Sequence, residues 1–210
     1  MTFHVIGLAG AKGAGKSEVA RLLVEQHGFV RMRFADGIKE MLKTLGLTEA
    51  QLEGAEKELP IPLLGGKTYR DAATTLGTGW GRNMMDEELW VRALGQRLIA
   101  LRLANPDVRV VIDDVRYPNE VRLIESFAGV MAKVRRPSVE PDLPWWKSAL
   151  VKLGFGKLVG IHSSEILWKS LDAEHTLWNV SDTTDLANKV SWLVQLVAPA
   201  PADGDFHVQS

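Results

Sequence analysis

Cysteine is absent from the 210-residue sequence. This absence excludes a disulfide framework, thiolate metal sites and a cysteine nucleophile, and it is compatible with a reducing compartment. Long apolar runs are also missing: no window approaches the roughly 18 apolar residues that a membrane span needs, and the start MTFHVIGLAG does not have the form of a signal peptide. We therefore expect a cytoplasmic protein that has no membrane partner.

An excess of positive charge is lacking as well. The chain has 25 basic and 26 acidic residues and a net charge of -1, so the charge balance does not indicate nucleic-acid binding through counterion release. The five histidines show no metal-ligand spacing and no Ser-His-Asp order, and we interpret His162 as a structural or lid residue. We expect a small-molecule partner and no nucleic acid. The oligomeric state stays open, with a homodimer among the alternatives.

Apolar runs rich in β-branched residues alternate with patterns of helical period, which predicts an α/β fold with a five-stranded parallel sheet flanked by helices. In such a fold, ligands bind at the carboxyl ends of the strands. The helical patterns include Val19 to Leu23, Ile38 to Leu45, Trp90 to Leu101 and Leu186 to Val197. The five expected strands are Phe3 to Leu8, Phe29 to Phe34, Val108 to Ile112, Val130 to Val134 and Thr176 to Val180.

Two stretches interrupt this alternation. We expect one domain over residues 1–197, with an insertion at about 37–83 that is glycine-rich and polar from Glu49 on, and a second insertion at about 137–164. Loops of this length are usually functional lids or disordered segments. The apolar run Trp145 to Leu153 favours a short helix inside the second insertion, and the proline-rich tail 198–210 is expected to be disordered.

A phosphate-binding loop is the strongest signal. Residues 10–17 match G-x-x-x-x-G-K-[ST] between an expected strand and an expected helix; a chance glycine-rich turn is the alternative. Backbone N–H groups of such a loop surround phosphate oxygens, Lys16 would reach the β- and γ-phosphates of ATP, and the Ser17 hydroxyl would bind Mg²⁺. The predicted ATP-binding loop residues are Gly10, Ala11, Lys12, Gly13, Ala14, Gly15, Lys16 and Ser17.

An acidic strand end is the second candidate element. The run Val110 to Asp114 ends in two carboxylates, where a P-loop enzyme places the group that holds the hydration shell of magnesium. We name Asp114 with Ser17 as metal ligands, but whether Asp113 or Asp114 faces the metal stays open. A cap of the following helix is the alternative role.

Candidate acceptor residues follow the second expected strand. Asp36 and Lys39 are substrate candidates, although Asp36 could equally be the N-cap of the next helix. Thr68 and Asp71 have capping-box spacing, which places Arg70 in a first helical turn, where it could bind a phosphate. An ordinary surface arginine is the alternative.

Aromatic and basic residues in the two insertions are further candidates. Trp80 and Arg82 lie in a glycine-rich segment that suits a nucleobase and its phosphate, although Trp80 could be a core residue instead. Arg135 and Arg136 end the fourth expected strand, where a closing lid would bring a guanidinium to the transferred phosphoryl group. Solvated surface charge is the alternative for this pair.

Taken in order, these motifs resemble the deoxynucleoside monophosphate kinases of tailed bacteriophages, from about residue 4 to residue 195. The glycine-tryptophan-arginine segment and the D-V-R-Y-P-N-E run are its most specific parts. The motifs are the phosphate loop, Arg33 to Lys39, Thr75 to Arg82, Asp114 to Glu120, Arg136-Pro137, His162 to Glu165 and Asn179. Asp113 departs from the pattern, which more often has a small polar residue there, and the insertion between Arg136 and His162 is unusually long.

The resemblance implies a P-loop kinase core with an acceptor-binding insertion and a lid, converting a dNMP and ATP to dNDP and ADP with Mg²⁺, in the host cytoplasm if phage-encoded. Catalysis would fall to Lys16, Arg70, Arg82 and Arg136; Arg136 and Asn179 would also contact ATP. The acceptor would be surrounded by Asp36, Lys39, Arg70, Trp80, Arg82, Asp114 and Arg116. Two alternatives stay open: a small-molecule kinase similar to dephospho-coenzyme A kinase, and a P-loop ATPase or GTPase that acts as a switch or motor.

Overall fold

The computed structural model describes residues 3–140, 144–152 and 167–197. The predictions for His162 and for the tail 198–210 lie outside these ranges. The chain divides into two compact units. We call the unit that ends at Arg31 and resumes at Asn105 the core unit, and the unit from Met32 to Ala104 the helical unit.

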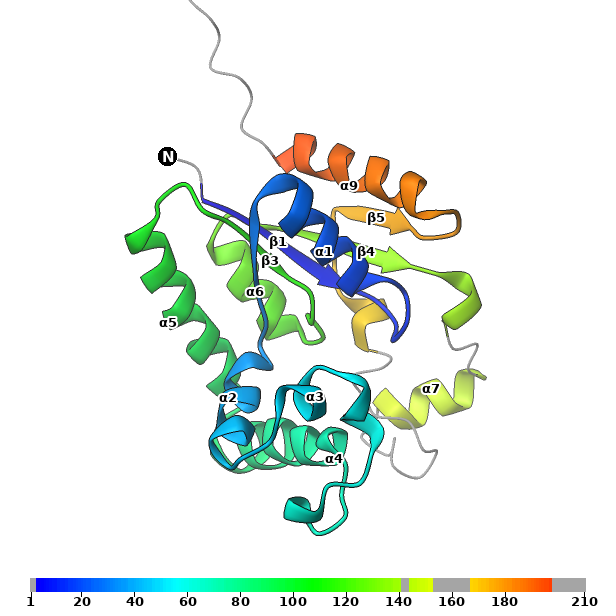
Figure 1. The fold of residues 1–210 in the computed structure, drawn as a ribbon. Coiled ribbons are helices and arrows are strands. Elements are labelled where there is room, and N and C mark those ends of the chain that lie inside the picture. Colours follow the sequence, from blue (N-terminus) through cyan, green and yellow to red (C-terminus); the bar gives the residue numbers. More distant parts are fainter. Residues whose placement is uncertain (1–2, 141–143, 153–166, 198–210) are drawn as a thin grey trace, which may run out of the picture. The chain divides into compact units, whose positions relative to one another are not determined.

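A five-stranded sheet forms the centre of the core unit (Figure 1). Its order is β2-β3-β1-β4-β5, and β1 pairs in parallel with β3 and β4, as β4 does with β5. The prediction of a five-stranded parallel sheet is therefore confirmed, with β2 and β5 both ending two residues earlier than expected. The strands are β1 His4–Ala9, β2 Phe29–Met32, β3 Arg109–Ile112, β4 Val130–Arg135 and β5 His175–Trp178.

Helices flank this sheet because packing against it buries their apolar faces. Helix α1 (Lys16–His27) buries Val19, Leu22 and Leu23 and packs beside α9 (Thr183–Val197), while α6 (Pro118–Ser126) packs on β1 and β4. A fully buried sheet needs apolar residues on both faces, and Val110, Val111 and Ile112 of β3 are all completely buried. Among the described residues, none of the helices combines the length and the apolarity that crossing a membrane requires.

The helical unit has a hydrophobic core of its own. That core includes Leu42, Leu52, Tyr69 and Trp90, with Trp80 packed against it. The unit contains the whole of the insertion predicted at about 37–83. Its elements are α2 Asp36–Thr44, α3 Glu49–Leu52, the 3-10 turns η1 Ala55–Glu58 and η2 Pro62–Leu64, α4 Tyr69–Thr74, the π-helix η3 Thr75–Met85 and α5 Leu89–Ala104.

The stretch predicted as a second insertion is described in part. After β4 come the 3-10 turn η4 (Pro137–Val139) and helix α7 (Trp145–Lys152), and the turn η6 (Trp168–Ser170) precedes β5. Within the apolar run predicted as a helix, the described residues Trp145–Lys152 form one. Its role as a lid stays a prediction.

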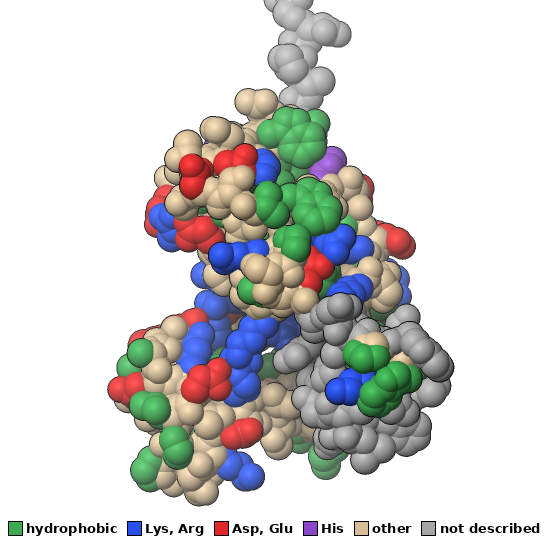
Figure 2. Space-filling view, turned by 90° about the vertical axis from the view of Figure 1, so that its right-hand side faces the viewer, with side chains coloured by type: hydrophobic (Ala, Val, Ile, Leu, Met, Phe, Trp, Pro, Cys, Tyr) green, Lys and Arg blue, Asp and Glu red, His purple; other side chains and the backbone are tan. Residues whose placement is uncertain are grey.

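Apolar side chains lie exposed beside β5 and α9. Trp178, Val180 and Trp192 are 43%, 61% and 49% exposed, and Trp192 packs edge-on against the ring of His175 at 5.7 Å. Figure 2 shows hydrophobic side chains, in green, gathered near a purple histidine in the upper part of the view. The predicted homodimer stays a prediction.

Candidate active site

The phosphate loop connects β1 to α1 in the core unit. Gly10 has φ +153°, and a Cβ there would lie 2.3 Å from the carbonyl oxygen of Val134 in β4. Gly15 has φ +105° and directly precedes α1. Side chains are therefore excluded where the loop passes the sheet and where it enters the helix. The first turn of α1 follows, and a helix N-terminus attracts anions. The loop thus combines left-handed glycines with a following helix N-terminus, as phosphate-binding loops do.

Lys16 lies against this loop. Its Nζ donates hydrogen bonds to the carbonyl oxygens of Gly10 and Ala11, at 2.7 and 2.8 Å. Burial, and next the positive charge of Arg116, lower the pKa of Lys16 to about 8, against the opposing effect of Asp113 and Asp114. The ammonium group is therefore held with few strong counter-charges, so that an arriving phosphate would be a better partner than its present surroundings.

Oxygen ligands suited to a metal ion meet at the end of β3. The Ser17 hydroxyl donates to Oδ2 of Asp113 over 3.4 Å, and Asp113 is only 5% exposed. A hydroxyl and a carboxylate at this spacing fit Mg²⁺, which prefers oxygen ligands and takes one or two protein carboxylates together with substrate phosphates. Asp114 is half-buried at the same strand end. Asp113 is therefore the aspartate that the structure places beside Ser17, while the predicted metal role of Asp114 stays a prediction.

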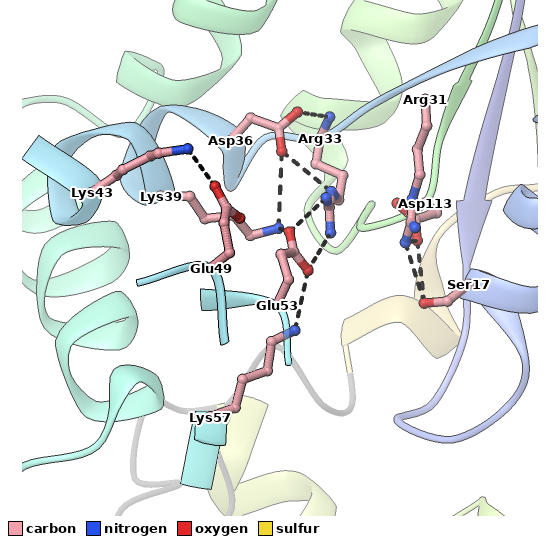
Figure 3. A network of polar contacts seen from close by, with 10 residues as sticks. All are labelled: Ser17, Arg31, Arg33, Asp36, Lys39, Lys43, Glu49, Glu53, Lys57 and Asp113. Carbon is pink, nitrogen blue, oxygen red and sulfur yellow. Dashed lines mark hydrogen bonds and ion pairs between the residues drawn. The ribbon is translucent and has the colours of Figure 1, made fainter. Parts of the chain in front are cut away.

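Arg31 of β2 holds the same oxygens. Its Nε donates to Oδ1 of Asp113 at 3.0 Å, and its Nη2 pairs with Oδ2 and also donates to the Ser17 hydroxyl at 3.3 Å (Figure 3). This bidentate pair provides the buried carboxylate with a counter-charge. The strand order explains the contact, because β2 is the neighbour of β3 in the sheet.

Asn179 contacts the loop from the end of β5. Its Nδ2 donates to the carbonyl oxygen of Ala14 at 3.0 Å, and its backbone N–H donates to the Arg135 carbonyl oxygen at 2.8 Å. A Cβ on Gly15 would lie 2.4 Å from Nδ2 of Asn179. Asn179 therefore supports the phosphate loop directly. Its predicted contact with adenine stays a prediction.

The end of β4 carries the two arginines that the sequence analysis singled out. Arg135 pairs with Glu140 through bonds of 3.0 and 2.6 Å, and its guanidinium lies 4.7 Å from the ring centre of Trp178. The hydrogen bond from Arg135 lowers the pKa of Glu140. Arg136 is the exposed N-cap of η4. The guanidinium of Arg135 thus binds the side chains of Glu140 and Trp178. Arg136 lies at the border of the predicted lid.

A cluster of charges converges on Glu53 in the helical unit (Figure 3). Arg33 pairs with Glu53 at 2.7 Å, Lys57 pairs with it at 3.3 Å, and Lys39 donates to the same carboxylate. Asp36 accepts from the backbone N–H of Arg33 at 2.8 Å and lies 3.9 Å from Lys39. We call these five side chains the Glu53 cluster. Helix α2 begins at Asp36 with Ala35 as its N-cap, so the alternative of Asp36 as the N-cap is wrong by one position.

The charges of this cluster shift one another's ionisation. Partial burial opposes the ionisation of Glu53, but hydrogen bonds from Lys39 and Arg33 outweigh it and lower the pKa to about 2. Burial also lowers the pKa of Lys39, because its desolvation outweighs the hydrogen bond to Glu53. A pocket of about 160 Å³ beside them is lined by Asp36, Lys39, Glu53 and further charged residues. It is smaller than the roughly 300 Å³ of ordinary ligand pockets, and four of its eight lining residues, Asp36, Glu40, Glu49 and Glu53, are carboxylates.

Two further acceptor candidates, Arg70 and Arg82, lie elsewhere in the helical unit. The capping box of Thr68 and Asp71 is confirmed, and it places Arg70 in the first turn of α4, where Arg70 pairs with Glu58 at 2.7 Å. Arg82 donates to the carbonyl oxygen of Glu87 at 3.2 Å. The residue preceding Glu58 in η1 is Lys57 of the Glu53 cluster, so this turn links Arg70 to the cluster.

Trp80 packs inside the helical unit. Its ring lies 6.3 Å from that of Trp90, whose indole N–H donates to the carbonyl oxygen of Gly77 at 2.8 Å. Both contacts involve the π-helix η3, and π-helical turns are frequent at functional sites. The structure shows a core contact for Trp80, and its predicted contact with a base stays a prediction.

Sequence similarity to a known protein assigns the chain to a family. No family model matches it. A protein of Acanthamoeba polyphaga mimivirus, provisionally named a deoxynucleotide monophosphate kinase, is 33% identical over 155 residues, covering 66% of this chain and 77% of the viral protein. The chain belongs to this deoxynucleotide monophosphate kinase family. It is accordingly an ATP-dependent phosphotransferase that acts on a small molecule. Because the relative comes from a giant virus, the bacteriophage subfamily stays a proposal.

Solved kinase structures resemble the chain at low sequence identity. APS kinase from Mycobacterium tuberculosis with AMPPNP and APS is 15% identical at a TM-score of 0.49, covering 92% of this chain and 98% of that one. Dephospho-CoA kinase from Campylobacter jejuni is 12% identical at 0.48, covering 93% and 98%. Both TM-scores lie below 0.5, so the fold assignment depends on the strand order and the phosphate loop.

Four residues of the kinase escaped the sequence analysis as site residues: Arg31, Arg33, Glu53 and Lys57. A charged residue inside the apolar run FVRMRF is an available signal for Arg31, because a charge in a covered parallel strand needs a partner. Glu53 offers no comparable signal, since its partners Arg33 and Lys39 lie 20 and 14 residues before it in the sequence.

Proposed function

We propose that the chain is a deoxynucleoside monophosphate kinase, which transfers the γ-phosphoryl group of ATP to a dNMP to give dNDP and ADP. The observation that carries the proposal is the phosphate loop, with Lys16 bound to its carbonyl oxygens and Ser17 beside Asp113. The name of the viral relative supports the acceptor class.

On the nucleotide side, the backbone N–H groups of residues 10–17 would bind phosphate oxygens, and Lys16 would neutralise the β- and γ-phosphates. Ser17 would hold Mg²⁺ together with Asp113 or Asp114. Bound Mg²⁺ supplies charge neutralisation at the transferred phosphoryl group. Asn179 supports the loop, and Arg136 is the proposed cation of the lid.

On the acceptor side, the Glu53 cluster is the proposed phosphate site of the helical unit. Arg33 and Lys39 there share one carboxylate, with Asp36 as a second anion. A phosphate dianion offers these cations more charge than Glu53 alone, and arginine suits bidentate phosphate recognition. Arg70, Trp80, Arg82 and Arg116 stay proposed contacts of the acceptor.

A general base is not required for this acceptor. The attacking phosphate oxygen is already anionic near neutral pH, because the second pKa of a phosphate monoester is about 6. Catalysis would then consist of aligning two polyanions and neutralising their repulsion. The Asp36 carboxylate supports a phosphate acceptor, because it already accepts from the Arg33 backbone and contacts two cations. A carboxylate engaged in this way is poorly placed to take a proton from a hydroxyl acceptor.

The test is a coupled assay of ADP release with ATP and Mg²⁺, comparing dGMP, dTMP, dCMP, dAMP and 5-hydroxymethyl-dCMP with dephospho-coenzyme A and with no acceptor. We expect release that depends on one or more dNMPs and is lost in Lys16→Ala. The control variant Arg21→Gln, on the exposed side of α1, should keep full activity, because the pairs of Arg21 among the described residues are with Glu18 and Glu25 of the same helix. Release without any acceptor would contradict the proposal and indicate a switch or motor ATPase.

Asp36→Asn separates the two kinase alternatives. With a phosphate acceptor, we expect a raised KM for the dNMP and a kcat that falls by less than about tenfold, because Asp36 only helps to position cations. With a hydroxyl acceptor, the loss of a general base would lower kcat by about 10² to 10⁴. The proposed place of the reaction is the cytoplasm, which is that of the host if the chain is phage-encoded.

A further inference from the structure

Arg31 contacts all three side-chain oxygens that Asp113 and Ser17 contribute to the candidate metal site. Its guanidinium engages Oδ1 and Oδ2 of Asp113 and the Oγ of Ser17. The side chain of Asp113 is 4% exposed and that of Arg31 is 31% exposed. The carboxylate is therefore sealed from solvent, while the guanidinium has an open side.

A buried carboxylate without a counter-charge is strongly destabilising. In the structure, Arg31 supplies that charge through a bidentate pair, the geometry in which arginine binds carboxylates best. Magnesium needs the same atoms, because it takes hydroxyl and carboxylate oxygens in strict octahedral geometry. A guanidinium bound to both oxygens takes one lone pair of each and places a positive charge beside the others, so it opposes a second cation at the same carboxylate.

We propose that Arg31 is a resident cation of the metal site, which competes with the divalent ion for Asp113 and Ser17. This inference rests on the proposed function only in assigning the site to Mg²⁺. In the absence of nucleotide, Arg31 keeps Asp113 neutralised and the site closed to free metal. Metal binding requires the guanidinium to leave Asp113 toward its open side. The competition makes binding of the free metal weak. The site therefore favours a metal ion that is already bound to further oxygen ligands, such as the phosphates of a nucleotide.

The competition is tested by titrating Mn²⁺ into the full chain without nucleotide and measuring the free ion by electron paramagnetic resonance. Arg31→Gln keeps a polar side chain but shortens it and removes its charge. We expect Mn²⁺ to bind at least about tenfold more tightly to this variant than to the wild type. Asp113→Asn in the same background should abolish the gain. Arg21→Gln, which removes an arginine from the surface of α1, should bind Mn²⁺ like the wild type.

Thermal unfolding provides the second readout. Without metal, Arg31→Gln should melt at a lower temperature than the wild type, because Asp113 loses its counter-charge. Mg²⁺ should restore much of this loss and should raise the melting temperature of the wild type far less. If Arg31→Gln does not fold, Arg31→Lys keeps a charge without the bidentate geometry, and we expect it to bind Mn²⁺ about threefold more tightly than the wild type.

Unchanged or weaker Mn²⁺ binding in both Arg31 variants would overturn the inference and leave Arg31 as a structural partner of Asp113. These measurements contain no acceptor and no turnover. A chain that failed to phosphorylate any dNMP could still show the competition, and an active dNMP kinase could fail to show it. The two proposals therefore fail independently.

Discussion

The side chain of Asn179 donates a hydrogen bond of 3.0 Å to the carbonyl oxygen of Ala14, which lies 165 residues earlier in the phosphate loop. The residue at the end of β5 thus helps to hold the loop at the end of β1, although β4 separates the two strands in the sheet. The form of the nucleotide site therefore depends on the last strand of the fold as well as on the loop sequence.

Asn179→Ala removes the donor to Ala14 and should destabilise the protein by about 1 kcal/mol, because an intramolecular hydrogen bond contributes about that much. We also expect a severalfold higher KM for ATP, since the loop loses one of its supports. Thermal unfolding and initial rates measure the two effects. Asn188→Ala, on the exposed face of α9, is the matched control and should leave both values unchanged. An equal effect of the two variants would argue against a role of Asn179 in the loop.

Gly10→Ala should destabilise the core unit by about 3 kcal/mol. The new Cβ would lie 2.3 Å from the Val134 carbonyl oxygen, at a φ of +153° that a side chain rarely adopts. Gly28→Ala is the control for backbone conformation alone, because φ is +69° there and no atom lies within 4 Å of the added Cβ. It should cost about 1 kcal/mol. Chemical denaturation measures both, and a cost for Gly10→Ala no larger than for Gly28→Ala would contradict the close packing of the loop on β4.

Gly81→Ala should disrupt the π-helix of the helical unit, because its Cβ would lie 2.4 Å from Nε1 of Trp90 and displace the indole that donates to Gly77. We expect a loss of about 2 kcal/mol and a change in tryptophan fluorescence. Gly79→Ala lies in the same π-helix with no atom within 4 Å of the added Cβ, and it should be neutral or slightly stabilising. Similar stabilities of the two variants would contradict the packing of Gly81 against Trp90.

Glu53 should make the stability of the protein sensitive to acid. Its pKa is about 2 in the folded state, against an ordinary value of 4.5, so its ion pairs stabilise fully above about pH 4.5. This contribution is lost as the pH falls toward 2, because the unfolded chain then takes up the proton first. The side chain is 36% exposed, and solvent screening limits the contribution to about 1 kcal/mol.

Glu53→Gln should therefore lower the stability at pH 7 and flatten its decline between about pH 4.5 and 2. Unfolding by urea at a series of pH values measures this. Glu56→Gln, three residues further on and exposed, is the control and should keep the wild-type pH profile. A wild-type profile in Glu53→Gln as well would mean that the cluster does not stabilise the folded state.

The sequence predicted the parts of the molecule that depend on local patterns. The parallel sheet follows from alternating apolar runs, and the capping box at Thr68 and the helix at Trp145 follow from spacings within a few residues. Lys16 and Ser17 belong to one contiguous motif, which is why their places were predictable.

Contacts between distant residues were not predictable in the same way. Arg31 and Asp113 are 82 residues apart and meet only because β2 and β3 are neighbours in the sheet. The sequence of neither strand predicts that β2 and β3 are neighbours in the sheet. The choice between Asp113 and Asp114 likewise depends on which side chain points toward Ser17. Because the two residues are identical and adjacent, the sequence does not distinguish them. Glu53 and Lys57 are four residues apart, but Arg33 and Lys39 precede Glu53 by 20 and 14 residues, and no local pattern predicts those two contacts.

Direct transfer of the phosphoryl group tests the central claim most closely. The purified chain would be incubated with ATP labelled with ³²P at the γ-phosphate, Mg²⁺ and each dNMP in turn, and the products separated by thin-layer chromatography. The account predicts label in a dNDP for at least one base, and none with Lys16→Ala. Label that appears only as inorganic phosphate, or only in dephospho-coenzyme A offered in place of the dNMP, would contradict the proposed function.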